Sequence, residues 1–121
     1  MGMHLLALPL LPGQTDGFKE FAAALEGDRK AEYEASLQRF GGLKERAYFG
    51  SGAGNDTVVY IIKGKPTIVS DVLKGFGASS DPFDQWFTQH MRDLHGLDLS
   101  GPEPLPDAKL VYKVKPEVPP E

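Results

Sequence analysis

Residues 43–63 read LKERAYFGSGAGNDTVVYIIK, and this stretch decides the fold. Two runs suited to β-strands, 43–50 and 57–63, flank a tip at 51–56 that is made of Ser, Gly, Ala, Asn and Asp. Glycine and asparagine tolerate the positive φ angles of tight turns, whereas β-branched and aromatic residues favour strands. The stretch therefore predicts an antiparallel β-hairpin.

Before the hairpin, the chain predicts one strand and one helix. The apolar run at residues 3–10 has the length and composition of a strand. Apolar spacings of three and four residues then predict one long helix, capped by Thr15 or Asp16, kinked at Gly27 and ending at Phe40.

After the hairpin, two shorter helices and a strand are predicted. Residues 68–76 carry apolar side chains at helical spacing. A further helix starts where Asp81 can accept free backbone N–H groups and Pro82 suits the first helical position, and it runs to about Leu94. Residues 109–115 predict the last strand.

These elements follow a βαββαβ order with one extra helical piece. This is the order of a ferredoxin-like sandwich, an α+β fold with helices on one face of an antiparallel sheet. A chain of 121 residues has the size of one domain. We expect a single ferredoxin-like α+β domain over residues 1–116 and a flexible C-terminal tail over 117–121.

The predicted strands are apolar on both sides. In the run at 3–10, and again at 57–63, alternating positions on either side carry apolar side chains. A sheet with two apolar faces needs a second cover besides its helices, and this chain has no spare element to provide it. We expect the sheets of two copies to pack together in a homodimer.

The chain resembles the dimeric α+β barrel superfamily in topology and size over residues 3–115. Within it, the segment 79–87, SSDPFDQWF, followed by 94–99, LHGLDL, resembles a small bacterial family without an assigned activity. The resemblance implies two ferredoxin-like subunits that close their sheets into one barrel, with a small hydrophobic ligand between sheet and helices. The superfamily includes haem-degrading and cofactor-free monooxygenases, polyketide cyclases, aldoxime dehydratase and chlorite dismutase relatives, and dye-type peroxidases. Fold alone does not choose among these activities.

Composition argues against several classes of protein. The 13 basic and 17 acidic residues leave a net charge of −4, which does not favour nucleic-acid binding. The chain has no cysteine, which excludes disulfides and thiolate nucleophiles. The apolar start at 5–11 is too short to span a membrane and lacks a preceding basic region, so we expect a cytoplasmic protein.

Three residues are candidates for catalysis. His90 falls on the apolar stripe of the last predicted helix, His4 on the leucine side of the first strand, and Tyr33 on the stripe of the long helix. Imidazole titrates near neutrality and suits acid–base work, and a phenol can donate a hydrogen bond to an oxyanion. The alternatives are a core histidine bonded to a backbone carbonyl, a surface histidine at the strand entrance and a buried tyrosine with an ordinary partner.

Five residues are candidates for ligand binding. Arg29 interrupts the stripe of the long helix and could hold a carboxylate ligand, the alternative being a salt bridge to a nearby glutamate or snorkelling. The aromatic candidates could wall a planar ligand, although core packing explains them equally well; they are Trp86, Phe87, Tyr48 and Tyr60.

The spacing of the three histidines matches no metal motif, and we predict neither a metal nor a cofactor. A variant with His90 as a haem ligand stays open. His95 suits a structural role at a helix C-terminus.

Two hypotheses for function follow. The first is a homodimer that binds a small hydrophobic or aromatic ligand and acts on it by histidine acid–base chemistry, of a cyclase, lyase or cofactor-free monooxygenase type. The second is a non-catalytic ligand-binding or assembly module.

Overall fold

The computed structural model describes residues 2–52, 54–64, 69–102, 111–114 and 116, and of these the side chains of residues 2, 4 and 69–72 lie outside the description. Within them the chain forms three strands and four helices: β1 (Gly2–Pro9), α1 (Thr15–Glu26), α2 (Lys30–Arg39), β2 (Lys44–Gly52), β3 (Asn55–Gly64), α3 (Val69–Ala78) and α4 (Pro82–His95). No helix of the described residues is both long and apolar enough to span a membrane.

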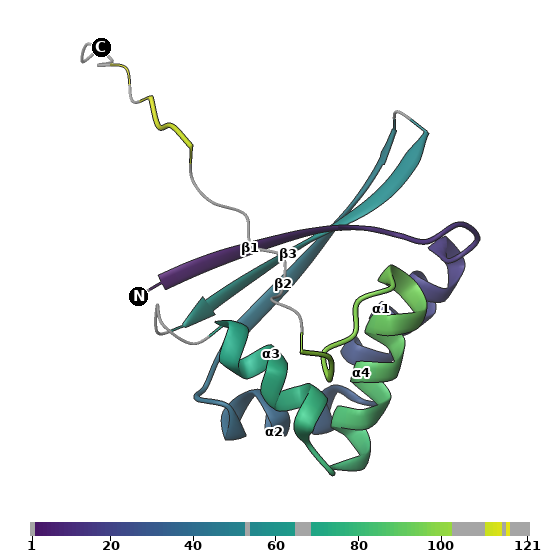
Figure 1. Ribbon diagram of the computed structural model, residues 1–121, viewed down its shortest axis with the longest axis vertical. Helices are drawn as coiled ribbons and strands as arrows, with labels where there is room; N and C mark the ends of the chain where they lie inside the picture. The colour runs from purple at the N-terminus through teal and green to yellow at the C-terminus, as the bar shows by residue number, and fades with distance from the viewer. Residues whose placement is uncertain (1, 53, 65–68, 103–110, 115, 117–121) are drawn as a thin grey trace.

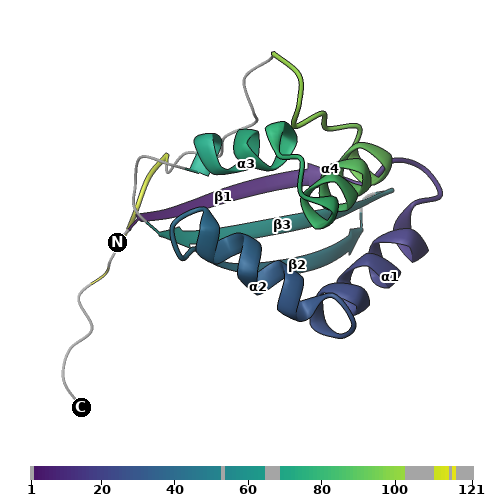
Figure 2. The same ribbon diagram turned by 90° about the horizontal axis from the view of Figure 1, so that it is seen from below.

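The strands form one antiparallel sheet in the order β1-β3-β2, and all four helices lie on one side of it (Figures 1 and 2). Leu6 of β1 and Ala47 of β2 both pair with Tyr60 of β3. The predicted hairpin is confirmed, with Gly54 at its tip in the left-handed region at a φ of 81°. A residue with a side chain is strained at this φ, so glycine suits the turn.

Alternation along the strands divides their residues between two faces. The inner face packs against the helices and carries Leu6, Leu8, Val58, Tyr60 and Ile62, all buried. The other face, here called the open face, is not covered by the helices. Its members from the three strands are Met3, Leu5, Ala7, Pro9, Lys44, Arg46, Tyr48, Gly50, Thr57, Val59, Ile61 and Lys63.

Aromatic side chains from the helices fill the core below the inner face. Phe21 of α1, Phe76 of α3 and Phe87 of α4 are buried, and the rings of Phe76 and Phe87 lie 4.8 Å apart. Burying each such ring contributes roughly 1.5–3 kcal/mol relative to exposure. Gly77 lets α3 approach the segment that follows α4, since a Cβ there would lie 2.2 Å from the carbonyl oxygen of Leu99.

The predicted start and end of α4 are confirmed. The side chain of Asp81 accepts hydrogen bonds from the backbone N–H groups of Phe83 and Asp84, at 2.9 and 3.4 Å, and a proline occupies the first turn. Gly96 follows the helix with a φ of 71°, and its N–H donates to the carbonyl of Arg92.

The prediction of one long helix is wrong. The chain breaks after Glu26 and resumes helix at Lys30, giving α1 and α2 as separate helices. Gly27 and Asp28 are both poor helix formers, and Arg29 stands before α2 as its N-cap residue. The break lets each helix direct its own apolar side toward the sheet.

The predicted last strand is wrong for the part of it that the structure describes. Residues 111–114 form no strand, and Val111, Tyr112 and Val114 are 89%, 78% and 75% exposed. The rest of that prediction, at 109, 110 and 115, and the predicted tail at 117–121 lie outside the described residues. Alternating β-prone residues form a strand only when a partner strand supplies the hydrogen bonds, and β1 pairs only with β3 among the described residues.

Candidate functional site

The candidate site lies on the inner face, where the carboxyl group of Glu45 faces helix α2. Alternation along β2 directs Glu45 inward, opposite Ile62 of β3. Tyr33 of α2 packs its ring on Phe83 and Phe87 of α4, with centroids 5.8 and 5.6 Å apart. The buried hydroxyl of Tyr33 makes no hydrogen bond, and Glu45 forms no ion pair with any described residue.

These two groups shift the pKa values of each other. Burial raises the pKa of the Glu45 carboxyl from 4.5 to about 7, and the phenol of Tyr33 offsets part of this increase. Burial, and then the charge of Glu45, raise the pKa of Tyr33 well above its usual value. At neutral pH the carboxyl can therefore both accept and return a proton, whereas the phenol stays protonated and can only donate a hydrogen bond.

Tyr60 and His95 form a separate bonded pair. His95 Nε2 lies 2.8 Å from the Tyr60 hydroxyl and His95 Nδ1 lies 2.9 Å from the carbonyl oxygen of Pro9. A carbonyl only accepts, so Nδ1 donates and the neutral ring accepts the Tyr60 proton at Nε2. Burial lowers the pKa of His95, which favours this neutral form. The predicted ligand-binding residue Tyr60 thus ties β3 to the end of α4.

The structure brings Arg29, Trp86 and His90 together in a second group. His90 Nδ1 lies 2.9 Å from the Trp86 carbonyl oxygen, and the two rings lie 4.3 Å apart. The guanidinium of Arg29 lies 4.4 Å from the Trp86 ring and pairs with Glu32 at 3.5 Å. Both arrangements match the structural alternatives, and no hydrogen bond or ion pair between described residues links the group to Glu45.

The other predicted site residues are dispersed. Phe87 is buried in the core. Tyr48 lies on the open face, where its hydroxyl accepts a hydrogen bond from Arg46 at 3.3 Å. His4 pairs with Ile62, in the same cross-strand row as Glu45, but its side chain lies outside the described part of the structure. The structure thus places Tyr33 near Glu45, a residue that the sequence analysis did not select.

The sequence analysis did not select Glu45, although its neighbours in the sequence mark it as unusual. Leu43, Glu45, Ala47 and Phe49 alternate along the strand, so an acid stands where the other three side chains are apolar. An acid on the apolar side of a strand is costly unless it is paired or protonated, and for that reason marks a candidate site.

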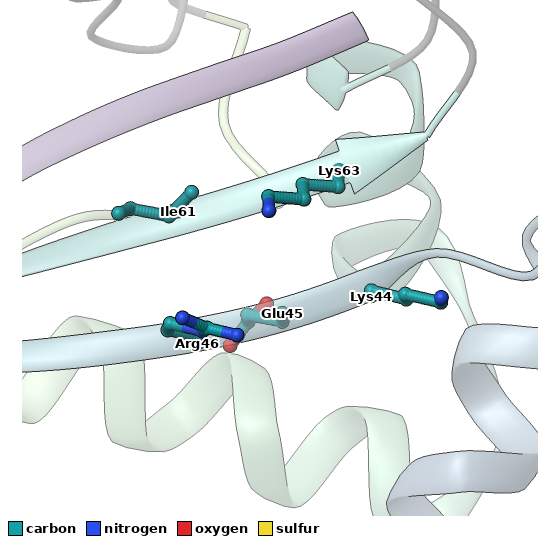
Figure 3. Close-up of a pocket in the computed structure, with 5 residues that line it drawn as sticks. All are labelled: Lys44, Glu45, Arg46, Ile61 and Lys63. Atoms are coloured by element: carbon teal, nitrogen blue, oxygen red, sulfur yellow. The ribbon is translucent and has the colours of Figure 1, made fainter. Parts of the chain in front are cut away.

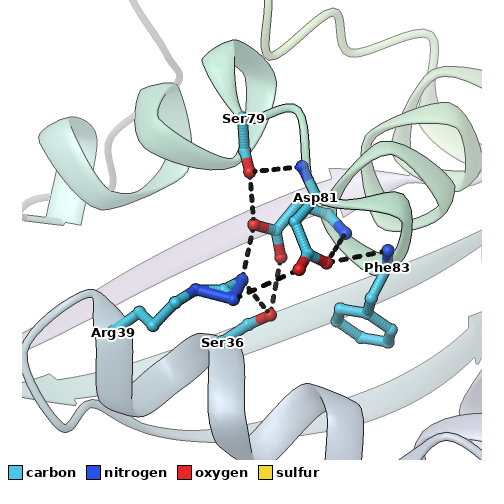
Figure 4. A network of polar contacts seen from close by, with 6 residues as sticks. Ser36, Arg39, Ser79, Asp81 and Phe83 are labelled. Carbon is cyan, nitrogen blue, oxygen red and sulfur yellow. Dashed lines mark hydrogen bonds and ion pairs between the residues drawn. The ribbon is translucent and has the colours of Figure 1, made fainter.

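A second polar cluster, also missed, surrounds Asp84 at the start of α4 (Figure 4). The fully buried carboxylate accepts hydrogen bonds from Ser36 Oγ at 2.6 Å, Arg39 Nη2 at 2.7 Å and Ser79 Oγ at 2.6 Å. Arg39 also lies 3.5 Å from the carboxylate of Asp81. Each polar group has a partner, so the cluster fastens α2 to the α3–α4 connection, as expected of a structural role.

A cavity of about 270 Å³ lies against β2 and β3 (Figure 3). Its lining residues are Lys44, Glu45, Arg46, Ile61 and Lys63. Four of these belong to the open face, whereas the alternation of β2 directs the side chain of Glu45 to the inner face. No group of three His, Asp or Glu side chains within the described ranges is arranged to hold a metal ion.

Comparison with known proteins gives one informative likeness. No protein-family model and no curated protein matches the chain. The structure is similar to the crystal structure of an L-rhamnose mutarotase from Formosa agariphila, with a TM-score of 0.56 and 14% sequence identity, over 95% of this chain and 100% of that chain. The two chains share a fold. The α+β, ferredoxin-like class predicted from the sequence is thereby confirmed, while the resemblance to a small bacterial family stays a prediction.

Proposed function

We propose that the protein is a homodimeric α+β barrel that binds a small molecule beside Glu45 and catalyses a proton transfer on it without a cofactor. The observation that supports this most is the Glu45 carboxyl, held without a cation next to the buried and unbonded hydroxyl of Tyr33. Acids with strongly shifted pKa values are frequent at functional sites. A group whose pKa lies near the working pH can both remove a proton from the substrate and return it.

The chemistry needs only these two side chains. The Glu45 carboxylate takes a proton from an O–H or an acidic C–H group of the substrate, and Tyr33 donates a hydrogen bond to the oxygen on which negative charge develops. The carboxylic acid then returns the proton to another atom of the substrate, and the enzyme regains its starting state. Cyclases, lyases and cofactor-free monooxygenases share the first of these steps, whereas an isomerisation needs nothing further.

The similar structure suggests which isomerisation to try first. It is an L-rhamnose mutarotase, and anomerisation of a sugar is a proton transfer of the required type. The aromatic residues around Tyr33 also suit a ligand with an apolar ring face, and they include Phe83 and Phe87.

The homodimer is proposed from the open face of the sheet. Met3 and Tyr48 are 58% and 51% exposed there, in the same face as the partly buried Leu5, Val59 and Ile61. A contiguous apolar surface of this kind is typical of an interface. Sedimentation of the purified protein should give the mass of two chains, and a monomer at all concentrations would contradict this part of the proposal.

Catalysis is tested by NMR exchange spectroscopy on L-rhamnose, followed by other reducing sugars and small carbonyl compounds. The wild type should accelerate exchange at a rate that rises with pH through about 7, because the carboxylate is the active form. Glu45→Gln should lose roughly 100-fold or more, and Tyr33→Phe should also lose activity. Glu34→Gln, a substitution of an exposed residue of α2, is the matched control. A catalysed reaction that Glu45→Gln leaves unchanged would contradict the proposal.

A non-catalytic ligand-binding module is the second candidate, favoured by the bonded and packed state of His90. Native mass spectrometry that finds a bound small molecule, together with no catalysed exchange, would support it. A catalytic role for His90 stays a prediction, as does its role as a haem ligand, which a Soret band in the purified protein would reveal.

A further inference from the structure

Basic side chains gather at one end of the open face, and the acid between two of them in the sequence, Glu45, belongs to the inner face by the alternation of β2. Lys44 and Arg46 of β2 and Lys63 of β3 form this group, here called the cationic end. The open face holds no Asp or Glu among its described residues, although the whole chain has 17 acidic and 13 basic residues. The cationic end therefore departs from the charge of the rest of the molecule.

The strand register forces these charges together. Lys44 pairs directly with Lys63 across β2 and β3, and Arg46 follows two residues later, opposite Ile61. Side chains in directly opposed positions have Cβ atoms about 4.5–5.5 Å apart, and like charges in such a pair are destabilising. Within the described chain none of the three cations forms an ion pair. The three side chains are exposed, so their repulsion is screened but not removed, and a bound anion would relieve it.

The cavity at this position is lined by all three cations. It measures about 270 Å³ and is also lined by Ile61 and by Glu45, whose side chain the alternation of β2 directs to the inner face (Figure 3). This is close to the lower end of the volumes typical of small-molecule sites, so it suits a small anion better than a large cofactor. The hydrogen bond from Arg46 to the Tyr48 hydroxyl, at 3.3 Å, holds the guanidinium over the same face.

We propose that the cationic end binds the oxyanion head group of a small ligand, a phosphate or a carboxylate, between Lys44, Arg46 and Lys63. The planar guanidinium can present two parallel N–H donors to two oxygens of such a group, and the two ammonium groups supply point charges. Binding relieves the repulsion between the paired lysines. The site lies on the open face, through which the homodimer is proposed, so it rests on that interface leaving the cationic end accessible, but it does not depend on the catalysis proposed at Glu45.

The test is a titration of the isotopically labelled protein with inorganic phosphate and, separately, with acetate and succinate, observed by backbone amide NMR. Saturable shifts should centre on residues 44–46 and 61–63. The preferred anion identifies the head group, phosphate or carboxylate. Lys44→Gln and Lys63→Gln should each weaken binding about tenfold or more, as expected for loss of a charged hydrogen bond. Arg46→Lys should weaken it less than Arg46→Gln.

The matched control is Lys30→Gln on α2, which removes the same charge from an exposed position away from the sheet. A second readout is thermal unfolding. Without added anion, Lys44→Gln should unfold at a slightly higher temperature than the wild type, because the repulsion is gone. Phosphate should stabilise the wild type and Lys30→Gln more than Lys44→Gln.

Three results would overturn the proposal. One is the absence of any saturable shift with all three anions, and another is equal weakening by Lys30→Gln, which would mean a general charge effect. The third is a loss of dimer on sedimentation of the Lys44 and Lys63 variants without anion binding by the wild type, which would assign the cations to an acidic group of a second copy. Rates with sugars are measured separately, so failure here is distinguishable from failure of catalysis at Glu45.

Discussion

Replacing Glu45 by glutamine should stabilise the fold above pH 7 and leave its stability unchanged near pH 4.5. In the unfolded chain the carboxyl has its ordinary pKa of 4.5, whereas burial raises the pKa in the folded protein to about 7. Below the lower value both states are protonated and the group has no effect. Between the two values the unfolded state loses its proton first, so the wild type loses stability as pH rises, until the folded carboxyl ionises as well.

The size of the effect follows from the two pKa values. Their separation corresponds to about 3 kcal/mol in the free energy of unfolding, which is the upper value because the side chain is only partly buried. Glutamine has nearly the same shape and stays neutral, so Glu45→Gln should escape this loss. The gain over the wild type should be near zero at pH 4.5, grow through pH 6 and level off above pH 7.

Urea unfolding at several pH values from 4.5 to 8 measures this difference directly. Glu34→Gln, at an exposed position of α2, is the control and should show little change at any pH. If Glu45→Gln were less stable than the wild type at pH 8, the carboxyl would be ionised and paired in the folded state, and if the difference did not vary with pH, its pKa would be the same in the folded and unfolded states. The reasoning about its burial would then be refuted.

Three further substitutions test other parts of the structure. Asp84→Ala should lower the free energy of unfolding by about 3 kcal/mol in urea denaturation, because donors on α2 and on the α3–α4 connection lose their shared buried acceptor. A substitution of the exposed Asp93 by alanine should change little, and similar effects from both would contradict the role given to the cluster. Gly77→Ala should cost about 2 kcal/mol or more in the same assay, since the new Cβ would lie 2.2 Å from the backbone oxygen of Leu99, and a neutral result would mean that the loop is free to move. Burial lowers the pKa of His95 in the folded state, so the neutral ring contributes fully to stability above pH 6.5, and this contribution is lost as pH falls through the pKa of the folded state. His95→Gln should therefore weaken the dependence of the free energy of unfolding on pH on the acid side. An unchanged dependence would argue against the neutral ring.

Those parts of the fold that depend on local signals were predictable from the sequence. The glycine at the hairpin tip and Gly96 adopt the positive φ that their turns need, and Asp81 accepts hydrogen bonds from backbone N–H groups two and three residues later. These effects act within a few residues and do not depend on distant contacts. The sequence predicted a kink at Gly27 but not the complete break between α1 and α2, because a stripe of apolar side chains shows which side is buried but not whether helical hydrogen bonding continues through the kink. The strand predicted at 109–115 depends on a partner strand, which no local pattern reveals.

The candidate site was predictable only in part. Helical spacing placed Tyr33 on a buried face, and this was sufficient to select it. Its partner Glu45 comes from a strand, and its raised pKa results from packing of α2 over β2, which sequence spacing does not show. His90 was selected because imidazole suits acid–base chemistry, yet its backbone partner and its aromatic neighbours are what a structural histidine requires.

The central claim, that Glu45 is a partly buried base poised near neutral pH, is tested most directly by its own titration. The protein would be labelled with ¹³C at the glutamate side-chain carboxyl carbons, and their NMR shifts would be followed with pH, with Glu45→Gln to assign the signal. We predict one carboxyl with a midpoint near pH 7 that is missing from the variant. Titration of every glutamate carboxyl near its ordinary pKa of 4.5 would contradict the account.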